Sequence, residues 1–197
     1  MTRSTVHVRP AAPDDVGALL ALWGEFTRRS LEPRAVEAAE ADALSAVVRI
    51  ASEPDERLLV AVVDDTVVGA THLVRSTISP IHCETAIYIT HLHVADGFRR
   101  RGVGRALMES AVTWAEEKDT GHVLAAASAN SRDANRFMAR LGLAQIAVVR
   151  GSATGALRNK LPVEPPAAAR VGSRSHRNVG QVLAQRRSQR RAQEKIT

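Results

Sequence analysis

The chain has 197 residues, which suits one domain with extensions, and 45% of them are hydrophobic, enough for a sizeable core. Aromatic residues make up only 3%, so Leu, Val and Ala must fill that core, and the single cysteine, Cys83, excludes an internal disulfide and favours a reducing compartment. Because the N-terminus has no apolar signal segment and no run approaches the roughly 18 apolar residues of a membrane span, we predict a cytoplasmic protein without a transmembrane segment.

The formal net charge of +6 is unevenly distributed along the chain. Residues 170–197 contain eight Arg or Lys and one Glu, a net of +7, whereas residues 1–169 are close to neutral at −1. The pI of about 10.6 therefore reflects the C-terminal tail. Any preference for an anionic partner is a property of that tail.

The N-terminal quarter predicts a strand followed by two helices. Residues Thr5–Arg9 alternate as a strand does, and Pro13 followed by two acidic residues is typical of a helix start. A break at Thr27–Pro33 ends this helix, and Arg34–Ser52 predicts a second one. The apolar stripe of the first helix consists of Leu19, Leu20, Leu22, Trp23 and Phe26.

Three strands are predicted next. Leu58–Val63 and Thr66–Val74 form a hairpin that turns at Asp64-Asp65. Ser76–Glu84 predicts a loop, and Ala86–Val94 predicts the strand that follows it.

Helices and strands alternate in the remainder of the folded region. Gly104–Lys118 predicts a helix, His122–Ser128 a buried strand, Ser131–Leu141 a helix that Gly142 ends, and Ala144–Arg150 a final strand. The order βααβββαβαβ predicts an α/β fold with one mixed sheet and helices on both faces.

The composition changes beyond Arg150, and three regions are expected. Residues 1–155 are expected to form the folded domain, residues 156–169 a Pro/Ala-rich linker, and residues 170–197 a basic tail that is disordered or a single helix. The loop-like segment Gly151–Gly155 closes the first region.

The segment from Leu92 to Leu107 predicts a binding site for an anionic phosphate group. An apolar strand enters a turn with four arginines and two glycines, and the turn opens a helix whose first N–H groups are unpaired. A P-loop would need Lys and Ser/Thr after the second glycine, where Arg105 and Ala106 stand. A dinucleotide fingerprint would need a third glycine at Leu107.

The pattern Arg99-x-x-Gly102-x-Gly104, five residues after Val94, resembles the acetyl-CoA signature of the GNAT superfamily of acyl-CoA N-acyltransferases. Residues Asn130–Leu143 are similar to the late helix of that family, and Pro10–Asp15 with the apolar helix after it is similar to its opening. The matches span residues 6 to about 150 and come in the order of the family.

The resemblance implies the GNAT fold, a central twisted mixed sheet of about six to seven strands with helices on both faces, here with a C-terminal basic extension. It also implies that the strand ending at Val94 splays from His122–Ser128, and that the pantetheine arm of acetyl-CoA enters between them. The residues it assigns to cofactor binding are Leu92, His93, Val94, Arg99, Arg100, Arg101, Gly102, Val103, Gly104, Arg105, Asn130 and Asn135.

The implied reaction is acetyl transfer from acetyl-CoA to a primary amine, by direct attack on the thioester. A backbone N–H near Val94 polarises the carbonyl in this family. The tyrosine that many members use as proton donor is replaced by Met138, so water, Ser128 or Asn130 remain as donors, or turnover is low. The positions where members carry a basic Glu or His are Thr90 and Tyr88. The candidate catalytic residues are Tyr88, which could orient a water or the acceptor, and Glu84, which could act through water.

Two histidines in the same strand, His91 and His93, invite a zinc interpretation together with Cys83. No spacing here matches a zinc motif, so no metal is expected. A proton-shuttling role for either histidine stays open beside packing against a helix.

The partners expected are acetyl-CoA, an amine acceptor (a small molecule or a protein) and a second copy of the chain in a homodimer. The acceptor is expected to meet the loops Thr27–Pro33 and Ser76–Glu84, whose mixed charge indicates no substrate. An alternative is an acyl-CoA-binding module with little turnover, docked through residues 170–197 to RNA, DNA or an anionic membrane surface.

Overall fold

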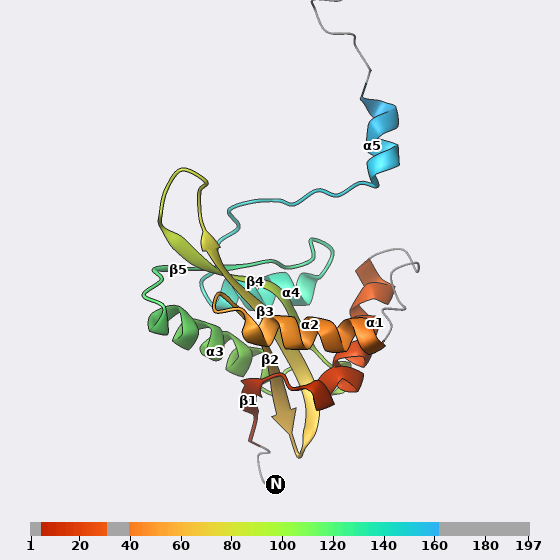
Figure 1. The fold of residues 1–197 in the computed structure, drawn as a ribbon, viewed down its shortest axis with the longest axis vertical. Helices are drawn as coiled ribbons and strands as arrows, with labels where there is room; N and C mark the ends of the chain where they lie inside the picture. The colour runs from red at the N-terminus through yellow and green to blue at the C-terminus, as the bar shows by residue number, and fades with distance from the viewer. Residues whose placement is uncertain (1–4, 31–39, 162–197) are drawn as a thin grey trace, which may run out of the picture. The chain divides into compact units, whose positions relative to one another are not determined.

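The chain divides into two compact units, residues 1–145 and 146–197, and the computed structural model describes residues 5–30 and 40–161, without the side chains of 25–30. The first unit combines a sheet with helices (Figure 1). Its strands are β1 (His7–Pro10), β2 (Glu56–Val63), β3 (Thr66–Thr77), β4 (Thr85–Val94) and β5 (His122–Ala125). Its helices are η1 (Pro13–Asp15), α1 (Val16–Ser30), α2 (Glu40–Ser52), η3 (Asp96–Phe98), α3 (Val103–Glu117) and α4 (Arg132–Arg140).

The sheet is mixed, with its strands in the order β1-β2-β3-β4-β5. Neighbours from β1 to β4 are antiparallel, and β5 runs parallel to β4. The β2–β3 connection turns at Asp64 and Asp65, whose φ values of 47° and 58° suit a tight hairpin of right-handed twist. The hairpin predicted at these two residues is therefore confirmed.

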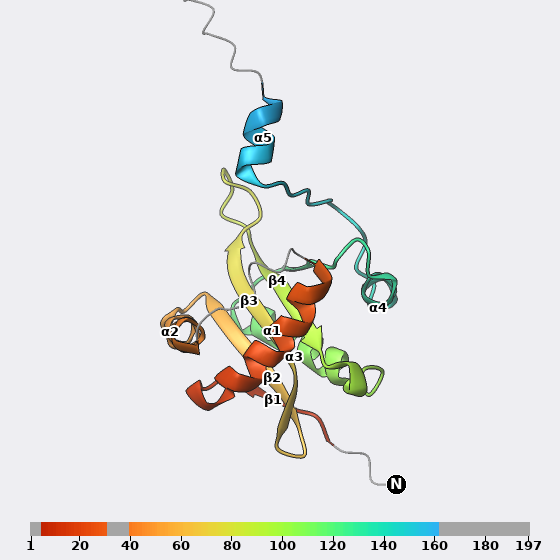
Figure 2. The same cartoon turned by 90° about the vertical axis from the view of Figure 1, so that its right-hand side faces the viewer.

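Helices cover both faces of the sheet, as Figure 2 shows with α2 on one side and α4 on the other. On the α1/α2 face, Leu19 and Val47 pack with Val60 of β2. On the α3/α4 face, Leu107 of α3 and Met138 of α4 pack with inward-facing strand residues such as Ile87. The strands contribute apolar side chains to the cores on both faces, because consecutive residues of a strand point to opposite faces of the sheet.

The start of α1 is held by a salt bridge rather than by a capping hydroxyl. Arg9 donates two hydrogen bonds to the Asp15 carboxylate, at 2.6 and 2.8 Å, and Asp15 also accepts the N–H of Ala12 at 2.8 Å. Hydrogen bonding from Arg9 lowers the pKa of Asp15, although burial acts in the opposite direction. This pair joins β1 to the first turn of the helical segment.

The expectation of six to seven strands is wrong for the described residues, which form five. Ala144–Arg150, predicted as a final strand, is not a strand, and its apolar residues Ile146 and Val149 are exposed at 74% and 93%. Alternating β-branched residues make a strand only where a neighbouring strand pairs with them, and none does so within the described part of the chain. Likewise, β5 ends at Ala125, three residues before the predicted end at Ser128, and it is only partly buried.

The break predicted at Thr27–Pro33 is also wrong in its first half, because α1 continues to Ser30 without an interruption. Residues 31–39, which include the predicted start of the second helix at Arg34, lie outside the described residues. Strand β3 likewise extends to Thr77, into the predicted loop Ser76–Glu84.

The second unit contains α5 (Thr154–Lys160) among its described residues, a helix that begins within the segment expected to be loop-like. The basic tail, residues 170–197, lies outside the described residues, and the boundaries at 155 and 169 stay predictions. Over the described parts of both units, no helix combines the length and apolar character needed to cross a membrane.

Candidate functional site

Strand β4 loses one of its two neighbours halfway along its length. It pairs with β5 only from Ala86 to Ile89, and the last contact between them is the Ala126 N–H donating to the Ile89 carbonyl at 3.0 Å. Residues 91–94 continue to pair with β3 on the other side. Among the described residues, no strand pairs with the second edge of 90–94, and we call this edge the β4 opening.

A β-bulge marks the beginning of the β4 opening. His72 pairs with His91, whereas the next residue of β3, Leu73, pairs with Ile89, so that Thr90 is an extra residue in β4. The bulge changes which face each side chain meets. Before it Ile89 packs on the α3/α4 face, and after it Leu92 and Val94 do so, while the ring of His91 packs against Trp23 of α1.

The backbone of the β4 opening presents N–H groups in a regular alternation. The Ala95 N–H donates to the Val68 carbonyl of β3 at 2.9 Å. Because successive N–H groups of a strand point to opposite sides, those of Leu92 and Val94 point away from β3 and along the open edge. A ligand lying along this edge could therefore accept backbone hydrogen bonds from both residues.

The turn after β4 is built as an anion cradle at the N-terminus of α3. Arg100 and Gly102 have left-handed φ values of 60° and 89°, which turn the chain sharply before Val103 begins the helix. The first helical hydrogen bond runs from the Ala106 N–H to the Gly102 carbonyl at 3.0 Å. Within the described part of the chain no side chain caps these N–H groups, so the first turn of α3 retains donors and the positive end of its dipole.

The two glycines of the turn differ in backbone conformation and in the space around them. At Gly102 the positive φ strains any residue with a side chain, although the space around it is open. At Gly104 a Cβ would lie 3.4 Å from the ring of Phe137, which is van der Waals contact, so α4 packs directly against the first turn of α3.

All four arginine side chains of the turn are exposed, and two of them are partly neutralised by carboxylates. Arg99 pairs with Asp96 at 2.7 Å and Arg105 pairs with Glu109 at 2.9 Å. Arg101 lies over the ring of Phe98, 5.3 Å from its centroid. Solvated arginine side chains therefore surround the cradle. Two of them, Arg99 and Arg105, would leave their carboxylate partners in order to contact a bound anion.

The polar residues predicted on the late helix occupy the segment between β5 and α4. Asn135 donates to the carbonyls of Ser128 and Ser131, at 2.9 and 2.8 Å, so its amide holds the turn that precedes the helix. Ser131 caps α4 by accepting the Ala134 N–H at 3.3 Å, and Asn130 is exposed in the same turn. Met138 is buried in the core, so the position of the family's tyrosine serves packing here.

The predicted catalytic residues Tyr88 and Glu84 lie at the other end of β4. The Tyr88 hydroxyl donates to the Thr77 carbonyl at 3.1 Å, and Glu84 pairs with His122 at 3.2 Å. Tyr88 precedes Leu92 by four strand positions, about 13 Å, and Glu84 is farther away. The structure brings neither residue to the β4 opening, and their catalytic roles stay predictions.

The histidines after the bulge gather instead on the α1/α2 face of the sheet. The rings of His91 and His93 lie 5.9 and 5.2 Å from that of Trp23, centroid to centroid. Burial, followed by the charges of His91 and Arg99, lowers the pKa of His93 to about 4, and burial together with His72 lowers the pKa of His91. Both rings are therefore neutral at pH 7. No group of three or more His, Cys, Asp or Glu side chains within the described ranges could hold a metal ion.

Two features near the site escaped the sequence reasoning. One is the bulge, because nothing in the letters around Thr90 marks an extra residue. The other is Gly69. A glycine inside a predicted strand can mark the close approach of another segment, and this was the available signal. A Cβ there would come within 2.9 Å of the His93 carbonyl and of a Val103 methyl, so Gly69 lets β3 and β4 pack closely against the start of α3.

Comparison with known structures places this geometry in a known fold. A structure of a transcriptional regulator from Bacillus halodurans is similar with a TM-score of 0.65 and 17% identity, covering 76% of this chain and 99% of that one. Glucosamine-6-phosphate N-acetyltransferase from Arabidopsis thaliana gives 0.63 and 14%, covering 76% and 99%. An aminoglycoside N-acetyltransferase solved in complex with CoA gives 0.62 and 14%, covering 77% and 95%.

At this level of identity, those likenesses establish the fold alone. A search of the curated proteins finds no match. The model of the acetyltransferase (GNAT) family matches residues 19–143, a range that includes the bulge, the β4 opening and the anion cradle. The chain therefore belongs to the GNAT family of acetyltransferases.

Proposed function

We propose that this protein transfers an acetyl group from acetyl-CoA to a primary amine. The observation that carries the proposal is the continuity between the β4 opening and the anion cradle. Within the described residues, no strand pairs with one edge of 90–94 and no side chain caps the first turn of α3, which follows within ten residues. The N–H groups along the β4 opening come first and those of the first turn of α3 follow. A ligand with an extended, amide-containing arm that ends in a pyrophosphate would meet both sets in this order.

The cradle suits the pyrophosphate of acetyl-CoA. Backbone N–H groups of Val103, Gly104 and Arg105 and the helix dipole favour an anion, and the arginines add charge around it. Along the β4 opening, the N–H groups of Leu92 and Val94 would bind amide and thioester oxygens. In the fold comparison, the aminoglycoside N-acetyltransferase was solved with CoA, which supports the same ligand here.

The reaction balances without a metal or a redox step. The neutral amine nitrogen attacks the acetyl carbon, and the C–S bond then breaks to give the acetamide and the thiolate of CoA. Of the two protons on the amine nitrogen, one stays on the amide and the other leaves to solvent or to the thiolate. A backbone N–H near Val94 would stabilise the oxyanion that forms on attack. Since Met138 is buried and cannot donate a proton, water or an exposed hydroxyl or amide of the Ser128–Asn130 turn would serve the thiolate.

One structure with this fold is named for an aminoglycoside and another for glucosamine 6-phosphate, and both names describe primary amines on sugars. Protein N-termini, lysine side chains and polyamines are equally compatible with the reaction. The alternative of a binding module docked through residues 170–197 depends on a segment outside the described residues, and no observation favours it.

The donor half of the proposal is tested by calorimetric titration of acetyl-CoA into wild type and Gly102→Glu. The new carboxylate would face the pyrophosphate at the cradle, and we expect affinity to fall at least tenfold. Gly142→Glu is the matched control, because Gly142 has φ of 85° and open space around it, close to the 89° and open space of Gly102, and the charge change is identical. Equal affinity in the two variants would contradict the assignment of the cradle.

A further inference from the structure

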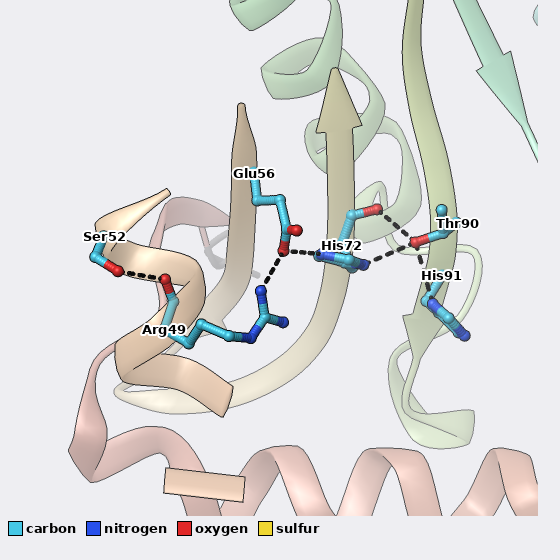
Figure 3. A network of polar contacts seen from close by, with 6 residues as sticks. All are labelled: Arg49, Ser52, Glu56, His72, Thr90 and His91. Carbon is cyan, nitrogen blue, oxygen red and sulfur yellow. Dashed lines mark hydrogen bonds and ion pairs between the residues drawn. The ribbon is translucent and has the colours of Figure 1, made fainter. Parts of the chain in front are cut away.

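A network of polar side chains crosses three strands on the α1/α2 face and ends at the β4 opening (Figure 3). It starts at Glu56 of β2, whose Oε2 lies 3.3 Å from Nε2 of His72 on β3. Nδ1 of His72 lies 2.9 Å from Oγ1 of Thr90, the extra residue of the bulge. The same oxygen lies 3.2 Å from Nδ1 of His91.

The bulge is what connects this network. In a regular strand the side chains of consecutive residues point to opposite faces, so Thr90 and His91 could not both lie beside His72. With the extra residue inserted, Thr90 Oγ1 contacts the rings of His72 and His91. The irregularity therefore has a chemical consequence beyond re-aiming the strand.

With His72 neutral, the donors and acceptors of the network allow one set of tautomers. The Glu56 carboxylate can only accept, so His72 donates from Nε2 and its Nδ1 carries a lone pair. In this tautomer the Thr90 hydroxyl would donate to that lone pair at 2.9 Å, whereas beside a protonated His72 it donates to the His72 carbonyl at 3.3 Å. Thr90 then accepts from Nδ1 of His91, and the lone pair of His91 is on Nε2.

We propose that His91 is the general base of this enzyme and that Thr90 and His72 pass the charge it acquires to Glu56. The inference rests on the proposed function and names the residues that generate the neutral amine. An ammonium acceptor gives one proton to Nε2 of His91. The Nδ1 proton of His91 moves to Thr90, and the Thr90 hydroxyl proton moves to Nδ1 of His72. The result is a neutral His91 and an imidazolium at His72 beside the Glu56 carboxylate, with the proton count unchanged.

The charges around the network favour this direction of transfer. Burial and the neighbouring His72 lower the pKa of His91, so the ring is neutral at pH 7 and passes on a proton that it accepts. The Glu56 carboxylate, 3.3 Å from His72, favours a positive charge there, and Arg49, 3.2 Å from the same oxygen, offsets part of this attraction. On the other side of His91 are the rings of His93 and Trp23, and Arg99 lies near enough to lower the pKa of His93. Displacing the positive charge from His91 to His72 brings it next to the carboxylate.

The position of His91 suits a base that serves an incoming amine. Its neighbour Leu92 offers a backbone N–H along the β4 opening, while the Leu92 side chain packs on the α3/α4 face. His91 projects to the opposite, α1/α2 face. A donor anchored at the N-terminus of α3 and an acceptor arriving beside His91 would therefore meet at the edge of β4 from opposite faces of the sheet.

The first test reads the network without any acceptor. Nitrogen-15 NMR of the imidazole rings at pH 7.5 should report the Nε2–H tautomer for His72 and the Nδ1–H tautomer for His91. Thr90→Val, which keeps the shape of the side chain and removes the hydroxyl, should abolish the Nδ1–H preference of His91. An Nε2–H tautomer at His91 in the wild-type protein would overturn the relay.

The second test uses an amine selected from a panel by its acetylation in the presence of acetyl-CoA. At pH 7.5 we expect Thr90→Val to lower kcat at least tenfold with the KM for acetyl-CoA unchanged, and Thr90→Ser to restore most of it. The deficit should narrow above about pH 9, where the amine loses its proton unaided, a response that a purely structural role of Thr90 would not produce. Thr85→Val is the control, since it removes a half-buried hydroxyl of the same strand that contacts only Thr120 in the described network of hydrogen bonds.

The outcomes separate the two proposals. Wild-type activity that Thr90→Val leaves within twofold overturns the relay and leaves the acetyltransferase standing. Binding of acetyl-CoA without acetylation of any amine overturns the proposed function, and the catalytic role of His91 with it.

Discussion

Replacement of Gly69 by alanine tests the packing that places β4 against the start of α3. The added Cβ would lie 2.9 Å from the His93 carbonyl oxygen, 2.9 Å from Cγ1 of Val103 and 3.4 Å from Cδ1 of Leu107. Val103 and Leu107 are fully buried, and the oxygen belongs to the backbone of β4, so no flexible side chain can yield. Relieving both contacts requires shifts of several tenths of an ångström in the strand and the helix.

Overpacking of this kind costs about 1–3 kcal/mol. The lower backbone entropy of alanine in the unfolded chain returns up to about 1 kcal/mol, so we expect a net loss of about 1–2 kcal/mol. Urea unfolding followed by circular dichroism measures the loss, and a fall in Tm of roughly 3–8 °C should accompany it. Because the displaced carbonyl lies between Leu92 and Val94, acetyl-CoA should also bind more weakly.

Gly24→Ala provides the matched control, since this glycine lies within α1 and a Cβ there meets no atom within 4 Å. It should stabilise the protein by about 0.5–1 kcal/mol through helix propensity alone. A Gly69→Ala protein as stable as wild type would refute the close approach of β3, β4 and α3.

Two further predictions concern pH and the first helix. The pKa of His93 is lowered from 6.5 to about 4 by burial, so between these values the unfolded chain binds more protons and stability falls as the pH falls from 6.5 toward 4. His93→Gln should reduce the acid loss in the free energy of unfolding by about 1–2 kcal/mol, a figure lowered for the partial exposure of the ring. Urea unfolding at a series of acid pH values measures this loss, and the same pH dependence in the variant and in wild type would contradict the burial argument. Asp15→Asn should destabilise the protein by about 1–3 kcal/mol at pH 7, because it breaks the paired hydrogen bonds with Arg9 at 2.6 and 2.8 Å. Since Arg9 lowers the pKa of Asp15, the difference between Asp15→Asn and wild type should shrink as the pH falls through that lowered pKa, and a pH-independent difference would exclude an ionic role for the pair.

Much of the fold follows from local patterns in the sequence. Val103–Glu117 has a continuous apolar stripe and a glycine turn before it, so both its existence and its start were predictable to within one residue. The hairpin at Asp64 and Asp65 was equally readable, because both residues tolerate positive φ. The family resemblance then predicted that β4 splays from its parallel neighbour, and in the structure the pairing of β4 with β5 ends at Ile89.

What could not be predicted depends on partners that are distant in the sequence. Ala144–Arg150 has the alternating pattern of a strand and yet pairs with no described strand. Whether such a segment becomes a strand depends on its neighbours in the folded chain, which the local sequence does not contain. Thr90 looked like a weak substitute for a catalytic residue, because the bulge that aligns it with His72 and His91 has no local signature. Glu56 escaped for the same reason, since it comes 16 residues before the histidine it meets.

Acetylation of a primary amine is the activity on which the proposed function depends most directly. Wild-type protein with acetyl-CoA and a panel of aminoglycosides, amino-sugar phosphates, polyamines and lysine-containing or free-N-terminus peptides should release free CoA. The released thiol and the acetylated amine, measured by mass spectrometry, should be equal in amount and proportional to enzyme concentration. Saturable binding of acetyl-CoA with no acetylated product from any member of the panel, and CoA release no faster than without amine, would contradict the central claim.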